Sequence, residues 1–138
     1  MTRDLLHCPP TTTLVGAASL MQNEDVGLLP VTDDDDNLLG VVTDRDIVVR
    51  CIAKNGDPLE MTVGDIMSND VETCRPDDTL EVALDRMSQA KVRRVPVVDE
   101  KKRLMGMISQ ADIALRTDRA SEVGRVVEDI SRPDSRSS

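Results

Sequence analysis

A gapless internal repeat is the feature of this 138-residue sequence that most restricts how it can fold. When the sequence is shifted by 66 positions, residues 1–47 align with residues 67–113, and 16 of these 47 pairs are identical. Other pairs exchange similar residues, such as Thr43 with Ser109. Two copies are too few to stack as a solenoid, so we expect two halves related by a pseudo-twofold axis.

Both copies predict the same order of elements. Each has a helix whose apolar residues recur at positions i, i+3, i+4 and i+7. These residues are Leu14, Ala17, Ala18 and Met21 in the first copy, and Leu80, Ala83, Leu84 and Met87 in the second. We expect a short strand before each helix, at 5–6 and 71–74, and Asp78 with Glu81 as a capping box at the second helix.

A hairpin follows each helix, with strands at 28–32 and 38–42 and again at 95–98 and 104–108. A last helix begins at Thr43 or Ser109, and in the first copy its apolar residues are Ile47, Val48, Cys51 and Ile52. The predicted fold is a mixed α/β (α+β) fold of two βαββα repeats packed sheet to sheet. We expect the first repeat and its connecting segment at 1–60, the second repeat at 61–120, and a C-terminal helix and disordered tail at 121–138.

Composition and charge exclude several classes of protein. The net charge is −9, and the chain has no Phe, Trp or Tyr, so neither a basic footprint nor a stacking platform for nucleic acid is present. We therefore do not expect nucleic acid as a partner. No apolar run approaches the roughly 20 residues that span a bilayer, so we do not expect a membrane either. The N-terminal residues lack the apolar core of a signal peptide, so we expect a cytoplasmic protein with reduced thiols. Three cysteines and one histidine give no zinc-type ligand set.

The two hairpin turns differ in charge. Residues 33–37, of sequence DDDDN, imitate the start of a calcium loop, but position six of such a loop is Leu38 instead of glycine. The equivalent residues 99–103, of sequence DEKKR, are mostly basic. We therefore interpret both segments as solvated hairpin turns.

One recurring motif carries the candidate binding residues. Both Gly40 to Asp46 and Gly106 to Asp112 contain a glycine, two apolar residues, a hydroxyl and an Asp three positions after it. On the motif alone, a helix cap of the Ser/Thr-x-x-Asp type is the commoner explanation. The same geometry also suits a nucleoside phosphate, because free N–H groups favour phosphate and a carboxylate can accept from ribose hydroxyls.

Cationic side chains near this motif are distributed unevenly. Arg93 and Arg94 precede the strand at 95–98, and their counterparts in the first copy are Gly27 and Leu28. Two guanidinium groups there would neutralise a phosphate chain, although charges at a strand end are usually only solvated. In the first copy Arg45 is the only nearby cation, so the second copy is better equipped for phosphate.

The repeat resembles the tandem cystathionine-β-synthase (CBS) domain, or Bateman module. Residues 28–33 with 39–47, residues 92–99 with 105–113, and the entry to the second copy at 63–67 carry the resemblance. The chain resembles the stand-alone bacterial CBS-pair proteins. The resemblance implies a homodimer, often disc-shaped, and binding of AMP, ADP, ATP or S-adenosylmethionine in two clefts between the copies.

The resemblance also implies individual roles. Asp46 and Asp112 would hold ribose, Thr43 and Ser109 ribose or phosphate, and Arg93 and Arg94 phosphate, with Arg45 beside the first motif. Leu5 and Leu6 would line the Asp112 cleft. Val71, Glu72 and Thr73 would line the Asp46 cleft, with adenine held by backbone and apolar groups.

Three functions remain open from the sequence. The first is a non-catalytic sensor of adenine nucleotide that signals to a separate, unknown effector protein and has no resident cofactor. The second is a ligand-free dimerisation or interaction scaffold. The third is a phosphohydrolase with Mg²⁺ on Asp44 and Asp46, but Gln110 replaces the first of these in the second copy, and no nucleophile–base pair recurs. We therefore do not expect an enzyme.

Overall fold

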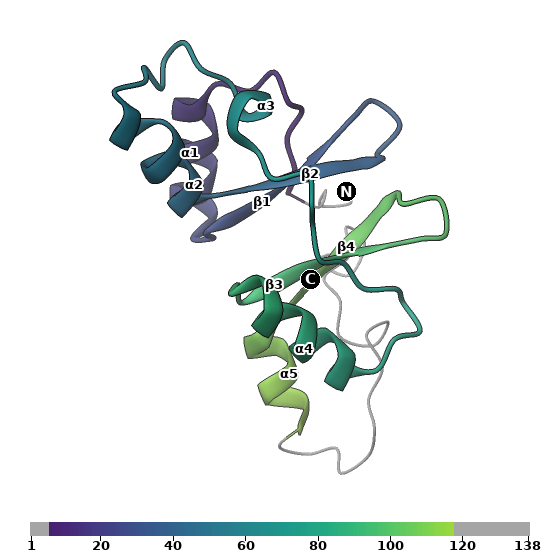
Figure 1. Cartoon of the computed structure of the whole chain (residues 1–138). Helices are drawn as coiled ribbons and strands as arrows, with labels where there is room; N and C mark the ends of the chain where they lie inside the picture. The colour runs from purple at the N-terminus through teal and green to yellow at the C-terminus, as the bar shows by residue number, and fades with distance from the viewer. Residues whose placement is uncertain (1–5, 118–138) are drawn as a thin grey trace. The chain divides into compact units, whose positions relative to one another are not determined.

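The computed structural model describes residues 6–117, which divide into two compact units (Figure 1). The N-terminal unit is Leu6–Val71, and the C-terminal unit begins at Glu72. Leu5 and the expected C-terminal helix and tail at 121–138 lie outside the described residues. No helix within the described part is long and apolar enough to cross a membrane.

The N-terminal unit combines one hairpin with short helices. Helix α1 (Leu14–Glu24) precedes strands β1 (Leu28–Thr32) and β2 (Leu38–Thr43). Helix α2 (Asp44–Arg50), a single 3-10 turn η1 (Ile52–Lys54) and helix α3 (Val63–Ile66) follow. The strands are antiparallel, with Leu28 opposite Thr43, and Figure 1 shows α1 and α2 beside them.

The C-terminal unit repeats this arrangement. Helix α4 (Leu80–Ala90) precedes strands β3 (Arg94–Val98) and β4 (Leu104–Ser109), and helix α5 (Gln110–Thr117) follows directly. Arg94 lies opposite Ser109, and the register shifts between Val97 and Val98, as it does between Val31 and Thr32 in the first hairpin. The predicted mixed helix and strand fold is therefore confirmed within each unit.

The helical stripes form the cores, except that Ala18, predicted on the apolar face of the first helix, is exposed and Leu84 is only partly buried. Leu14, Ala17 and Met21 are buried against Leu29, Val31 and Val42 in the N-terminal unit. Their counterparts Leu80, Ala83 and Met87 are buried against Val95, Val97 and Ile108 in the C-terminal unit. Aliphatic residues do this without any aromatic residue, and each large one contributes about 1.5–3 kcal/mol through burial.

The predicted first strand of each copy is wrong in extent. Cys8 and Cys74 each form one isolated parallel bridge, to Val31 and Val97. Cys8 N donates to Pro30 O at 3.0 Å, and Thr32 N donates to Cys8 O at 3.0 Å. Prolines follow within two residues of each cysteine, and because proline has no N–H the pairing cannot continue beyond the cysteine. Before the cysteines, Leu6 and residues 71–73 form no bridge.

Two details of the helices also differ from the prediction. The N-cap of α4 is Thr79, whose hydroxyl accepts from Val82 N at 3.3 Å, whereas the Asp78 carboxylate accepts from Arg75 N at 2.8 Å. In α2 and η1, Val48 and Ile52 are 57% and 50% exposed instead of buried. A helix of two turns presents only the i, i+4 pair of Ile47 and Cys51 to the core, and Val48 lies about 100° around the helix.

The segment after residue 60, which we assigned to the second repeat, packs on the first. Val63 N donates to Thr12 O at 2.8 Å, and Val41 exchanges two backbone hydrogen bonds with Ser68, at 3.0 and 2.8 Å. Gly40 permits this approach, because a Cβ at that position would collide with the Ser68 carbonyl oxygen. The N-terminal unit therefore extends to Val71.

Candidate functional site

The candidate residues of both copies lie where a hairpin ends and a helix begins. Thr43 and Ser109 are the last residues of β2 and β4, and α2 and α5 begin at the next residue. The recurring motif therefore spans the same strand-to-helix junction in each unit.

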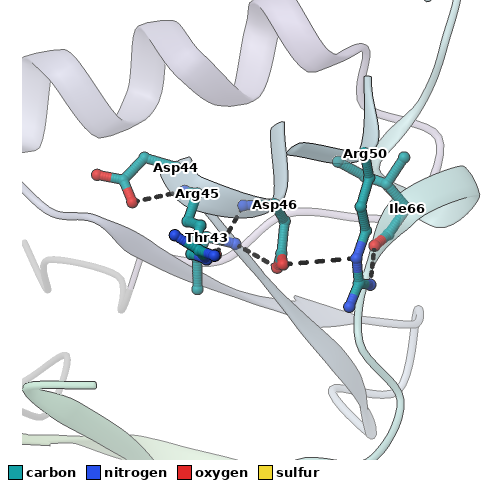
Figure 2. Close-up of polar contacts among 6 residues, drawn as sticks. All are labelled: Thr43, Asp44, Arg45, Asp46, Arg50 and Ile66. Atoms are coloured by element: carbon teal, nitrogen blue, oxygen red, sulfur yellow. Dashed lines mark hydrogen bonds and ion pairs between the residues drawn. The ribbon is translucent and has the colours of Figure 1, made fainter. Parts of the chain in front are cut away.

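At the first junction, Thr43 and Asp46 form a reciprocal capping box (Figure 2). Asp46 N donates to Thr43 Oγ1 at 3.0 Å, and Thr43 N donates to Asp46 Oδ2 at 3.0 Å. The second carboxylate oxygen of Asp46 lies 3.8 Å from Arg50 Nε. Arg50 Nη1 also donates to Ile66 O at 2.8 Å. The Asp46 carboxylate is thus part of the local fold, as the capping explanation predicts.

Acidic groups surround this junction. Asp44 is exposed, and its carboxylate accepts from Arg45 N at 2.7 Å (Figure 2). Asp44 N donates to Gly27 O at 3.1 Å, which brings the start of α2 against the residue before β1. Arg50 is already engaged by Asp46 and Ile66 O, so the two carboxylates face the exposed Arg45, and the first junction is a poor place for a phosphate chain.

The second junction has a different charge. Gln110 N donates to Arg93 O at 2.7 Å, and Arg94 lies opposite Ser109 in the β3–β4 register. Asp112 N donates to Ser109 Oγ at 3.1 Å. The structure therefore brings Arg93, Arg94, Ser109 and Asp112 together at the start of α5.

The two aspartates differ in their use. No hydrogen bond or ion pair engages the Asp112 carboxylate within the part of the chain whose side chains are described. The Asp46 carboxylate, by contrast, is engaged through both oxygens. The second junction accordingly combines an available carboxylate with two guanidinium groups.

The residues expected to line the clefts have separate places. Leu6 packs against the N-terminal core, and Val71 ends that unit. Glu72 and Thr73 belong to the C-terminal unit, where Arg86 of α4 donates from Nη1 to Thr73 O and places Nε 3.8 Å from Glu72 Oε1. The assignment of these residues to clefts stays a prediction.

Sequence analysis missed Arg50 and Arg86 as supporting residues. The spacing of Asp46 and Arg50, i and i+4 on one helix, is the signal that could have identified the first. No local spacing links Arg86 to Thr73, because the bond joins a helix to the segment preceding it.

The cysteines behave as core residues. Cys8, Cys51 and Cys74 are free thiols and are buried. Burial raises the pKa of Cys74 to about 11, with the negative charge of Asp78 adding to the effect. No group of three or more His, Cys, Asp or Glu side chains that could hold a metal ion is found among residues 6–117.

Comparison with known proteins places the chain in a family. The CBS domain model matches residues 1–52 and 63–117. Hypoxic response protein 1 of Mycobacterium tuberculosis is 40% identical over 102 residues, which are 74% of this chain and 71% of that protein.

Solved structures agree with this match. A crystal structure of Hypoxic Response Protein I with two coordinated zinc ions has a TM-score of 0.73 and 36% identity, covering 84% of this chain and 94% of that one. The CBS domain pair of protein MJ0100, in complex with 5′-methylthioadenosine and S-adenosyl-L-methionine, has a TM-score of 0.71 and 25% identity, with coverage of 84% and 93%. The chain therefore belongs to the CBS domain family and carries the domain as a tandem pair.

Proposed function

We propose that this protein is a non-catalytic sensor that binds an adenosine-containing ligand: AMP, ADP, ATP or S-adenosylmethionine. The MJ0100 pair, which binds 5′-methylthioadenosine and S-adenosyl-L-methionine, supports an adenosine ligand. The binding of ligand shifts the packing of the protein and is transmitted to a separate effector protein in the cytoplasm. Such coupling requires that the ligand bind one arrangement more tightly than the other.

The observation that carries the proposal is the second junction. The start of α5 offers the positive end of the helix dipole, which favours phosphate, although Gln110 N and Asp112 N already donate to Arg93 O and Ser109 Oγ. Arg93 and Arg94 add two positive charges, and the Ser109 hydroxyl adds a hydrogen-bonding group beside them. Asp112, whose carboxylate is available, is the acceptor for the ribose hydroxyls.

The first junction supports a lesser role in phosphate binding. Asp46 would have to leave Thr43 N and Arg50 to bind ribose, and Asp44 would repel phosphate. The same engagement disfavours Mg²⁺ on Asp44 and Asp46, and with it the phosphohydrolase alternative. We therefore assign the phosphorylated ligand to the second junction, with Thr43, Arg45 and Asp46 as secondary contacts.

An exposed apolar surface supports the homodimer. Val48, Val49 and Ile52 on α2 and η1 are 57%, 41% and 50% exposed. We call these three residues the α2 face. Because removing such side chains from water is favourable, the α2 face contributes to association between two chains.

The absorbance of the protein provides the first test. With no Trp, Tyr or Phe, it is nearly transparent at 260 nm, so a bound adenine is visible directly. We expect an absorbance peak near 260 nm after addition of ATP and removal of the excess by desalting. Calorimetry with ATP and adenosine then gives the two affinities.

Variants locate the site. Arg93→Gly with Arg94→Leu installs the residues of the first copy, and we expect ATP to bind about 10–100-fold more weakly while adenosine binding is retained. Lys54→Gln with Arg75→Gln removes two charges at exposed positions and is the control. If neither ATP nor adenosine binds the wild-type protein, the ligand-free scaffold replaces our proposal.

A further inference from the structure

The two hairpin turns share one architecture. Asp33 Oδ1 accepts from Asp35 N at 2.9 Å and from Asn37 N at 3.0 Å. Asp99 Oδ1 accepts from the equivalent Lys101 N at 2.8 Å and Arg103 N at 2.9 Å. Asp36 and Lys102 both have a φ of 66°. The turn is therefore set by Asp33 or Asp99, the backbone and the residue four positions on, since Asn37 Nδ2 and Arg103 Nε donate to the second carboxylate oxygen. The charges at 34–36 and 100–102 do not build it.

The charges on these turns are opposite. Asp34, Asp35 and Asp36, here called the acidic tip, are all exposed. Residues 100–103, here called the basic tip, carry Glu100, Lys101, Lys102 and Arg103, also exposed. Among the ion pairs between described residues, none involves the acidic tip, and only Arg103 of the basic tip is paired, with Asp99 at 3.1 Å.

We propose that the acidic tip of one chain binds the basic tip of a second copy of the same chain. The inference rests on the homodimer of the proposed function and adds the orientation of its subunits. One chain carries one tip of each sign, so in a twofold-symmetric pair each tip meets its opposite and the contact occurs twice. The alternative orientation places like charges together.

Association of two chains depends more on local charge complementarity because each chain is acidic overall. Two chains of net charge −9 repel one another, so association needs either apolar contact or local attraction between opposite charges. Exposed ion pairs contribute little individually and are screened by salt. The tips therefore select orientation and confer salt dependence, while the α2 face supplies apolar contact.

The repeat provides matched variants, because each replacement residue already occurs at the equivalent position of the other turn. Asp35→Lys with Asp36→Lys makes both tips basic, and Lys101→Asp with Lys102→Asp makes both acidic. The fourfold variant exchanges the tips. Asp33 and Asp99 stay in place, so the turns are retained, and thermal unfolding checks this.

The measurement is the dimer dissociation constant by sedimentation velocity at low and high NaCl. We expect salt to weaken the wild-type dimer, and each twofold variant to associate about tenfold more weakly than wild type at low salt. The fourfold variant returns to the wild-type value. An equimolar mixture of the two twofold variants forms a heterodimer.

General repulsion predicts a different result. The variant with two basic tips has a net charge of −9 + 4 = −5, so reduced repulsion alone would strengthen its dimer. A stronger dimer in that variant overturns the inference. Failure of the two mixed variants to associate also overturns it, because the acidic and basic tips then do not attract one another between chains. Variants that dimerise like wild type overturn the tip contact alone. A wild-type monomer at every salt concentration overturns the proposed dimer as well, with nucleotide binding measured separately.

Discussion

His7 Nδ1 lies 2.8 Å from Thr32 Oγ1, joining the segment before the first bridge to the end of β1. Thr32 is only 2% exposed, so its hydroxyl needs a partner inside the protein. The single histidine of the chain, 25 residues away in sequence, is that partner. The equivalent residues of the second copy are Thr73 and Val98, and Val98 is 4% exposed. The second copy thus fills the same position with an apolar side chain that needs no partner.

Replacing His7 alone should destabilise the protein. His7→Thr removes the partner of the Thr32 hydroxyl, and an unsatisfied buried hydroxyl costs about 1–3 kcal/mol. Adding Thr32→Val installs the pair of the second copy and should recover most of this loss. Urea unfolding followed by far-ultraviolet circular dichroism measures both, and a double variant no more stable than His7→Thr would contradict the explanation.

The two junction aspartates should respond differently to truncation. Asp46→Ala removes a capping-box acceptor and should lower the free energy of unfolding by about 1 kcal/mol. Asp112→Ala should change it by less than about 0.5 kcal/mol, since only its backbone N–H bonds Ser109. In calorimetry Asp112→Ala should weaken ATP binding about tenfold or more. Equal stability losses with unchanged binding would leave both aspartates as caps.

Gly40 should not tolerate a side chain. A Cβ there would meet the Ser68 carbonyl, which accepts from Val41 N at 3.0 Å, so Gly40→Ala should cost about 1–3 kcal/mol. Gly16→Ala is the milder comparison, because a Cβ there would lie 3.2 Å from Thr13 Oγ1 and 3.3 Å from Thr12 Cγ2, side-chain atoms that can shift where the Ser68 backbone cannot, and a helix favours alanine over glycine. Thermal unfolding of the two variants should separate them clearly, and similar melting temperatures would argue against the close approach.

Cys74 should make stability depend on alkaline pH. Burial raises its pKa from the ordinary 9.0 to about 11 in the folded protein. Because the pKa is higher in the folded than in the unfolded protein, the protonated Cys74 thiol contributes to the free energy of unfolding. This contribution is complete below pH 9 and is lost as the pH rises toward 11. The loss should amount to about 2 kcal/mol. Urea unfolding across this window should show a steeper decline for wild type than for Cys74→Ala, and parallel curves would refute the assignment.

Local pattern was sufficient for much of the fold. The spacing of Leu14, Ala17 and Met21 correctly predicted the buried face of α1, because helix geometry alone brings these positions together. The Ser/Thr-x-x-Asp motif likewise predicted the Thr43 cap, since all of its bonds lie within four residues. The predicted clefts are a different matter, because they depend on the relative placement of the copies and stay a prediction.

By itself the sequence determined that two equivalent units exist, which side chains face each core, and where the last helices begin. These properties depend on repeat, periodicity and local hydrogen bonding. Only the tertiary structure decided that Ser68 pairs with Val41, that Arg50 joins Asp46 to Ile66, and that His7 satisfies Thr32. Periodicity predicts that a face must be buried, but contacts between residues distant in sequence decide what buries it. For this reason two similar motifs differ: the Asp46 carboxylate is engaged, and the Asp112 carboxylate is available.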